Sequence, residues 1–208
     1  MEAAPRYKVA DDELLDAACE VFADEGFDRA KMEALADRGG VTKPTLYARF
    51  GSKDALFEAT VLREYELRKD RLFAAYAADG DEPFRSRLHR WVAAYFDFVR
   101  ERPHGFRLIS EGERHPGGAA IVERANSEIV DRIAELVVRI SRHDSPRGAR
   151  LVAAMISGML TSCAREAASR SRVDLEQASA LCEQFLHSAL RGLDPDLMDA
   201  VDGSNKRP

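Results

Sequence analysis

Apolar side chains recur at intervals of three and four residues along nearly the whole chain, and this spacing restricts the possible fold more than any other feature. The clearest example is the series Phe84, Leu88, Trp91, Tyr95 and Phe98. Residues three and four positions apart share one face of an α-helix, whereas a half-buried strand needs strict alternation. Glycine and proline residues cluster between the periodic segments, where they separate one helix from the next. The sequence therefore predicts an all-α fold.

The periodic segments predict three helices before residue 51 and mostly longer ones after it. The first ends at Gly26, a glycine turn at 38–40 ends the second, and the third spans about two turns after Thr42. Further helices are expected at about 52–78, 84–102, 105–114, 119–141, 147–172 and 174–191. The polar tail from Asp194 to Pro208 is expected to be frayed.

The composition is that of a soluble globular protein. Hydrophobic residues make up 45% and charged residues 32% of the chain, which predicts a packed core. The length of 208 residues suggests a division into a small and a larger part. No apolar run approaches the roughly 18 residues that cross a bilayer, and no secretory signal opens the chain, so we expect a cytoplasmic protein that does not enter membranes. The three cysteines, Cys19, Cys163 and Cys182, fit a reducing compartment. They are interpreted as small buried hydrophobes, with a redox sensor as the alternative.

Charge is distributed unevenly along the chain. The formal net charge of −5 argues against a nucleic-acid partner for the chain as a whole, because phosphate contacts need Lys and Arg. Between residues 29 and 53, however, six basic residues outnumber two acidic residues, Glu33 and Asp37, which gives a net charge of +4. The six are Arg29, Lys31, Arg38, Lys43, Arg49 and Lys53. We call this segment the basic segment, and it is the candidate for contact with DNA.

The order of the first helices predicts a helix-turn-helix. A supporting helix precedes two short helices joined by a glycine turn, and the second short helix of such a motif enters the major groove of DNA. On that second helix, Leu46 and Phe50 lie four residues apart and are expected to face the core. Pro44, Thr45, Tyr47 and Ala48 then point outwards, where small and polar side chains can approach base pairs.

Each outward residue has a chemistry that suits DNA. Thr42 and Lys43 lie at the helix N-terminus, whose free amides attract phosphate, and Thr45 can hydrogen-bond a base or a phosphate. Pro44 and Ala48 can contact thymine methyl groups. Tyr47 can donate its hydroxyl to a phosphate, and Lys53 adds charge at the start of the next helix. The alternative interpretation is a capped surface helix with no DNA partner.

The segment from Val41 to Phe57, VTKPTLYARFGSKDALF, resembles the signature of the tetracycline-repressor (TetR) family of bacterial regulators. The stretches 21–27 and 32–36 also match, so the recognisable part covers about residues 11–60. The resemblance implies a homodimer with a three-helix DNA-binding domain, and a helical C-terminal domain that holds an inducer pocket and the dimer interface. It also implies release from DNA when a ligand binds. By position, the resemblance assigns DNA contact to Thr42, Lys43, Pro44, Thr45, Tyr47 and Lys53.

The sequence departs from the family pattern just before the second helix. Family members usually carry Thr or Ser there, which caps the helix and bonds phosphate, whereas this chain has Ala30. Lys31 is expected to replace the missing contact by charge. Arg6 and Lys8 are interpreted as part of a disordered terminus, with an arm that reaches the minor groove as the alternative.

The chain is expected to divide into a DNA-binding domain at residues 1–56 and a helical ligand-binding and dimerisation domain at 57–208. An apolar inducer pocket is predicted between the aromatic helix and the helices after it, although core packing explains the same residues. The candidate lining residues are Trp91, Tyr95, Phe98, Phe106, Met155 and Met159.

The last two helices are the candidate dimer surface. Ala154 and Gly158, four residues apart, permit close approach of a second helix, and apolar residues on two faces suit a four-helix bundle built from two subunits. The alternative is a purely intramolecular core. A two-fold dimer places its recognition helices about 34–36 Å apart and therefore predicts an inverted-repeat operator in double-stranded DNA.

Motifs typical of enzymes do not occur in the sequence. The histidines at 89, 104, 115, 143 and 187 show no metal-ligand spacing, and there is no glycine-rich phosphate loop or nucleophile elbow. We therefore predict neither catalysis nor a cofactor nor a metal site. The predicted function is a ligand-released, homodimeric repressor. Its alternatives are an activator, or a helical protein that binds a small molecule or another regulator and binds DNA only weakly.

Overall fold

The computed structural model describes residues 6–77, 82–141, 145–169 and 173–202, and within these ranges every regular element is a helix. The predicted all-α fold is confirmed. By their contacts the residues group into two compact units, Met1–Arg68 with Arg102–Ala125, and Lys69–Glu101 with Asn126–Pro208. We call them unit 1 and unit 2. The functional division at residue 56 stays a prediction, because this grouping by contacts does not test it.

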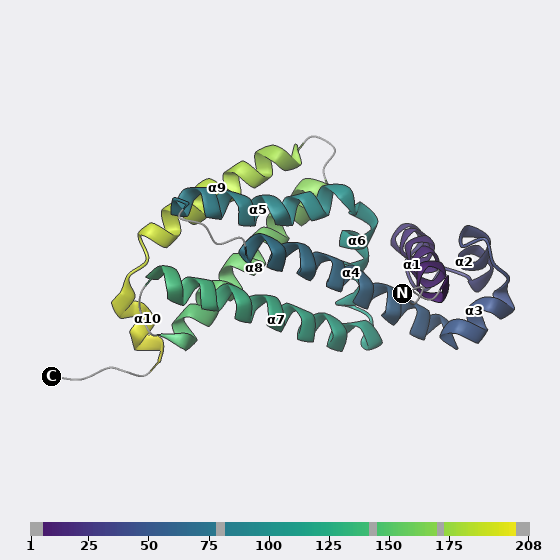
Figure 1. Ribbon diagram of the computed structural model, residues 1–208. Helices are drawn as coiled ribbons and strands as arrows, with labels where there is room; N and C mark the ends of the chain where they lie inside the picture. The colour runs from purple at the N-terminus through teal and green to yellow at the C-terminus, as the bar shows by residue number, and fades with distance from the viewer. Residues whose placement is uncertain (1–5, 78–81, 142–144, 170–172, 203–208) are drawn as a thin grey trace, which may run out of the picture. The chain divides into compact units, whose positions relative to one another are not determined.

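Unit 1 contains α1 (Arg6–Glu25), α2 (Met32–Arg38), α3 (Lys43–Phe50), α6 (Pro103–Gly112) and the first parts of α4 (Lys53–Ala77) and α7 (Pro116–Ser141). Helix α1 packs against α2 and α6, and α2 packs against α3 (Figure 1). The rings of Phe22 and Phe57 meet edge to face, with centroids 5.2 Å apart, and both are fully buried. This aromatic contact joins α1 to the start of α4.

The turn between α2 and α3 requires glycine at two adjacent positions. Gly40 has a φ of +64°, in the left-handed region that residues with a Cβ rarely adopt. At Gly39, an added Cβ would lie 2.7 Å from Cδ2 of Leu14, so this turn packs directly on α1. The predicted glycine turn is confirmed, and it fixes how α3 leaves α2.

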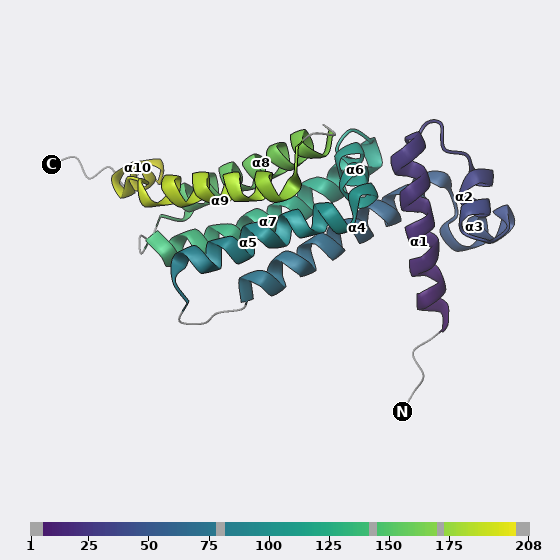
Figure 2. The same ribbon diagram turned by 90° about the horizontal axis from the view of Figure 1, so that it is seen from above.

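Unit 2 contains α5 (Phe84–Glu101), α8 (Pro146–Ser169), α9 (Leu175–Arg191), α10 (Pro195–Val201) and the remaining parts of α4 and α7. Helix α9 runs beside both α5 and α8 (Figure 2). The apolar stripe of α5 is buried from Leu88 onwards, whereas Phe84 at the start of the helix is half-buried. Tyr95 of that stripe donates its hydroxyl to Oγ1 of Thr161 on α8, over 3.0 Å.

Three expectations about helix boundaries are wrong. The chain directly after Asp194 is helical rather than frayed, because Asp194 caps a further helix, α10, whose Met198 is buried. Helix α1 begins at Arg6, so Arg6 and Lys8 belong to a helix rather than to a disordered terminus. Helix α7 begins at Pro116, since a proline and small residues fit a first helical turn.

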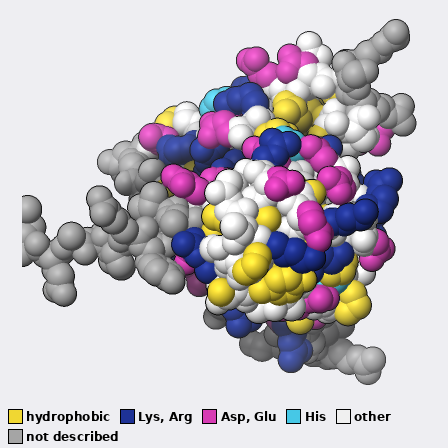
Figure 3. Space-filling model, turned by 90° about the vertical axis from the view of Figure 1, so that its right-hand side faces the viewer, with side chains coloured by type: hydrophobic (Ala, Val, Ile, Leu, Met, Phe, Trp, Pro, Cys, Tyr) yellow, Lys and Arg dark blue, Asp and Glu magenta, His cyan; other side chains and the backbone are white. Residues whose placement is uncertain are grey.

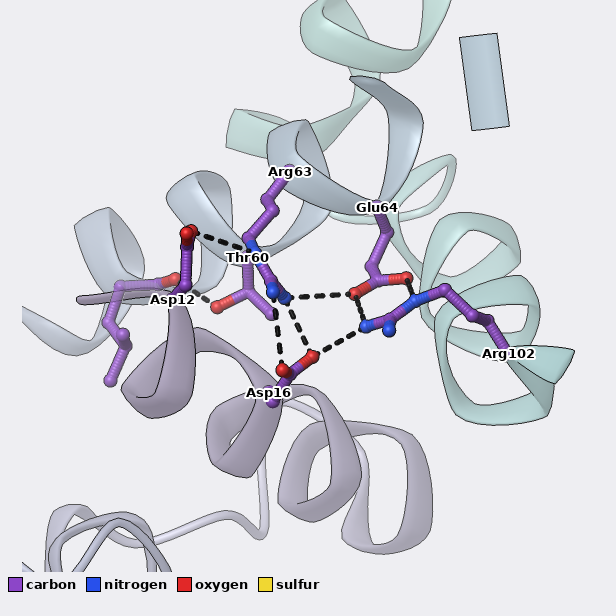
Figure 4. Close-up of polar contacts among 7 residues, drawn as sticks. Asp12, Asp16, Thr60, Arg63, Glu64 and Arg102 are labelled. Atoms are coloured by element: carbon purple, nitrogen blue, oxygen red, sulfur yellow. Dashed lines mark hydrogen bonds and ion pairs between the residues drawn. The ribbon is translucent and has the colours of Figure 1, made fainter. Parts of the chain in front are cut away.

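A cluster of charged side chains joins α1, α4 and α6 inside unit 1 (Figure 4). Glu64 on α4 is fully buried and accepts two hydrogen bonds from Arg102, at 2.7 Å from Nε and 2.5 Å from Nη2. Arg102 also donates to Asp16 on α1 over 2.6 Å, and Arg63 donates to both oxygens of Asp16. Glu64 thus receives a bidentate partner, as a buried carboxylate needs.

The two arginines also determine the charge state of Asp16. Partial burial alone would raise the pKa of Asp16, but hydrogen bonds from Arg63 and Arg102 outweigh burial and lower the pKa. The hydrogen bonds that Arg102 donates to Glu64 are the largest influence on the pKa of Arg102, and they raise it. Asp16 and the two arginines therefore stay charged near neutral pH, and their ion pairs hold the three helices together.

Replacement of Arg102 with Met is expected to lower the free energy of unfolding by about 3 kcal/mol, because the buried Glu64 carboxylate would keep only the 3.5 Å contact with Arg63. Chemical denaturation checks this value. The matched control is Arg100→Met, since Arg100 pairs with Asp97 at the surface, where both side chains are exposed. The control is expected to cost less than about 1 kcal/mol. Equal losses in the two variants would mean that the cluster adds no more than a surface ion pair.

Candidate nucleic-acid interface and ligand cavity

Helix α3 is capped at both ends by residues that its sequence supplies. At the N-terminus, Oγ1 of Thr42 accepts a hydrogen bond from the amide of Thr45 over 3.4 Å, and the two hydroxyls lie 2.8 Å apart. Pro44 occupies the first turn, where its missing amide has no cost. At the C-terminus, Gly51 adopts a φ of +80°. These caps define a short helix whose first turn is exposed.

The structure exposes three of the four residues of α3 that are predicted to point outwards, and it leaves the fourth, Thr45, half-buried. Leu46 is buried, Tyr47 is 44% exposed, and Pro44 and Ala48 are exposed as well. Phe50, which is expected to face the core, is only half-buried. The outer surface of α3 is therefore small and polar, with one phenol, and its buried side rests on unit 1.

Four of the seven predicted DNA-contacting residues line one open depression on unit 1. These are Lys31, Lys43, Tyr47 and Lys53, and the depression also includes Asp28–Glu33. Thr42, Pro44 and Thr45 lie on the adjoining first turn of α3. Lys31 is exposed and occupies the N-cap position of α2 without a capping hydrogen bond from its side chain. The residues come from two helices and two connections, and they form one continuous surface.

Most cations of the basic segment already have partners within unit 1. Lys43 binds Glu33, with 2.5 Å between Nζ and Oε1, and this hydrogen bond raises the pKa of Lys43 and lowers that of Glu33. Arg38 pairs with Glu20 at 2.7 Å, and Arg49 contacts Asp11 at 3.1 Å. Figure 3, with the α2–α3 end of unit 1 towards the viewer, accordingly shows Lys and Arg side chains interspersed with Asp and Glu. The local positive charge is partly compensated.

Lys53 supports the loop before α2. Its ammonium group donates to the carbonyl oxygens of Phe27 and Ala30, over 2.8 and 3.1 Å, and lies 4.4 Å from the centre of the Phe27 ring. An ammonium group has three donors, so one N–H remains for a phosphate. Lys53 therefore fixes the position of Ala30, where the family usually carries a hydroxyl side chain.

Sequence patterns did not reveal two further supports of this loop. Oε1 of Glu111, near the end of α6, accepts a hydrogen bond from the amide of Phe27 over 2.7 Å. The ring of His115 packs on Phe27 and Phe57, with centroids 4.2 and 4.7 Å apart. Both residues lie more than 80 positions after Phe27, and such distant pairings leave no periodic signal in a sequence.

An apolar cavity in unit 2 lies between α4, α5, α7, α8 and α9. Its lining consists of Tyr76, Leu88, Trp91, Val92, Ile133, Leu136, Val137, Ile140, Ile156, Leu160, Leu186 and Leu190. Of the six residues predicted to contact a ligand, Trp91 is the one in this lining. Tyr95 and Phe98 are buried in unit 2, Met159 is half-buried there, and Phe106 belongs to unit 1. Met155 is 65% exposed on α8.

In the part of the chain that the structure describes, no group of three or more His, Cys, Asp or Glu side chains is arranged to hold a metal ion. His143 lies outside the described residues. No helix among the described residues combines the length and the apolar character that a membrane span needs.

Comparison with known proteins identifies both parts of the chain. Residues 14–60 match the family of bacterial regulatory proteins called tetR, and residues 83–191 match the tetracyclin repressor-like C-terminal domain. The HTH-type transcriptional activator FasR of Mycolicibacterium smegmatis is 34% identical over 86% of this chain and 81% of its own length.

Solved structures give the same result. A TetR-like transcriptional regulator from Rhodococcus sp. RHA1 superposes with a TM-score of 0.75 at 26% identity, over 91% of this chain and 100% of that one. The fatty acid degradation regulator FadR from Bacillus halodurans shares the fold, with a TM-score of 0.73 at 20% identity, over 88% and 99% of the two chains. The chain therefore belongs to the TetR family of DNA-binding transcriptional regulators.

Proposed function

We propose that this regulator is a homodimer that reads an inverted-repeat operator through α3 and releases it when an apolar small molecule binds in unit 2. The observation that carries the proposal is the exposed first turn of α3. It presents Thr42, Pro44 and Thr45 beside the depression that Lys31, Lys43 and Tyr47 line. A recognition helix needs this combination of a small polar surface and flanking donors for phosphate.

The residues of this surface divide into two roles. Lys31, Lys43, Tyr47 and the remaining N–H of Lys53 bind phosphates, which position the protein on any DNA. Thr45 and Pro44 face the base edges and set the sequence preference. Because Glu33 already holds Lys43, a phosphate must displace a carboxylate to bind there. This exchange weakens binding to arbitrary DNA and so favours operators that supply base contacts as well.

Replacement of Tyr47 with Phe is expected to weaken binding to every DNA by about fivefold, because one hydrogen bond to phosphate is lost. Thr45→Val is expected to change the order of preference among operator variants instead, by about tenfold or more at one base pair. Fluorescence anisotropy on a panel of single-base variants checks both. Thr45→Ser, which keeps the hydroxyl that bonds Thr42, is the control. Uniform losses for both Tyr47→Phe and Thr45→Val would refute the assigned roles.

Support for a dimer comes from apolar side chains that α8 and α9 leave exposed. Leu151 and Met155 of α8 are 50% and 65% exposed, and Leu181 and Phe185 of α9 are 64% and 63% exposed. Each pair is spaced by four residues, so each marks one face of its helix. Gly158 has open space where a Cβ would project. Large apolar side chains in such a group mark an interface more often than a free surface.

The double variant Leu181→Glu with Phe185→Glu is expected to be monomeric at concentrations where the unchanged protein is dimeric, because two buried carboxylates would face their copies across the two-fold axis. Sedimentation equilibrium measures the mass. Leu67→Glu, an exposed apolar position on α4, is the control and should remain dimeric. A double variant that keeps the dimer mass would show that the subunits associate through another surface.

Activation is the second candidate for the sign of regulation. FasR, which is 34% identical to this chain, is named a transcriptional activator. The interface on α3 serves either outcome, because a bound dimer blocks or recruits polymerase according to where its operator lies. Reporter assays with the operator placed upstream of, or across, a promoter distinguish an activator from a repressor.

A further inference from the structure

A second cavity in unit 2 adjoins the apolar one beside α10. Its lining is Val137, Ile140, Ser141, Leu190, Leu193, Pro195 and Met198. Val137, Ile140 and Leu190 also line the first cavity, so the two cavities share a wall of three aliphatic side chains. Pro195 and Met198 belong to α10, which lies beyond the part of the chain that matches the family's C-terminal domain. Helix α10 is thus the outer wall of the second cavity.

The lining of both cavities restricts the ligand. Neither lining contains Asp, Glu, Lys or Arg. Burial of an ionised group without a partner costs several kcal/mol or more, so the part of a ligand inside must be uncharged. Trp91 lines the first cavity, and its buried indole N–H has no hydrogen-bond partner among the described residues. A ligand with a neutral acceptor on an apolar body would satisfy this donor.

Helix α10 is attached to the start of α8 by a small polar contact, which we call the α10 latch. Oδ1 of Asp202 accepts a hydrogen bond from the amide of Arg147 over 3.0 Å. The buried hydroxyl of Ser145 lies 2.5 Å from Oδ2 of Asp202 and 2.7 Å from the carbonyl oxygen of Met198. A Cβ at Gly148 would lie 2.8 Å from the same carbonyl, so α10 and α8 are in close contact.

Apart from the latch and its close approach to α8, α10 contributes one buried side chain. The helix has seven residues, and a helix of this length is not stable on its own. Met198 is buried, but Leu197 is 67% exposed and Val201 is 42% exposed. A short segment with one buried apolar side chain belongs to the part of a protein that opens at low cost. The latch is therefore the main contact whose loss would release α10.

We propose that the two cavities form one channel for a ligand with an uncharged apolar body, and that α10 is the cover over the channel. Release of Asp202 and Met198 from Ser145 opens the second cavity, and the ligand then passes Val137, Ile140 and Leu190 to reach Trp91. This proposal rests on the proposed ligand binding in unit 2. It adds the path by which the ligand enters and the contact that limits its entry. It requires that the latch set the rate of binding more than the affinity.

Trp91 is the single tryptophan of the chain, so its fluorescence reports on this channel without labels. Bromododecanol is a suitable probe, because it is uncharged and its bromine quenches an indole on contact. In stopped-flow mixing, Asp202→Ala and Ser145→Ala are each expected to raise both the association rate and the dissociation rate about fivefold, as the loss of one hydrogen bond would. The dissociation constant should change by less than about twofold. The latch is closed both in the free protein and in the ligand complex, so its loss destabilises these two states equally.

Asp196→Ala is the matched control, since it makes the same truncation and the same change of charge at the other end of α10, away from Ser145, and it should keep the rates of the unchanged protein. Thermal melts identify any variant that has lost its fold. If one latch variant does not fold, the other still tests the proposal. If both latch variants quench Trp91 at unchanged rates, the cover is refuted while the ligand cavity stands. If bromododecanol does not quench Trp91 in any variant, the ligand cavity itself is refuted, and the channel with it.

Discussion

The buried carboxylate of Glu64 is the interaction on which unit 1 depends. It lies between α1, α4 and the start of α6, and it is tolerable there because Arg102 binds it with two hydrogen bonds and reaches Asp16 as well. A buried ion pair adds little net stability compared with an apolar pair, but it is costly to break, so its geometry is strongly specified. It fixes the position of α1, and the glycine turn that sets the direction of α3 packs against α1. The surface that we propose for DNA binding is therefore positioned by charges that lie well behind it.

At that surface, most of the basic side chains are held by acidic partners or by backbone carbonyls. Lys43 is paired with Glu33, and Lys53 is bonded to Phe27 and Ala30. Such partners orient the cations in advance and also reduce the attraction for arbitrary phosphates. The acidic net charge of the whole chain is consistent with this arrangement. A regulator that must find one operator among many sites benefits from weak non-specific binding, because specificity is a ratio of affinities.

The sequence predicted features that depend on local chemistry. The helices, the caps of α3 and the burial of Leu46 follow from periodicity and from Thr42 and Gly51. Features that depend on residues far apart in the sequence left no such local signal. Met155 has the character of a core residue but lies exposed on α8, and Trp91 alone among the candidates lines the cavity. The ion cluster joins residues 16, 64 and 102, which no spacing connects. Helix α10 did carry a local signal, the cap Asp194 before Pro195, but the polar composition of the tail concealed it.

We propose that the exposed turn of α3 reads a specific inverted repeat. The most direct test is to select DNA from a random pool and to measure the affinity of the protein for the enriched sequence and for a scrambled copy, by fluorescence anisotropy over a series of salt concentrations. We expect selection to enrich an inverted repeat whose half-sites lie about one helical turn apart. The protein should bind this DNA far more tightly than the scrambled copy, and its affinity should fall steeply as the salt concentration rises. Equal affinity for the enriched and scrambled DNA at every salt concentration would contradict the proposal.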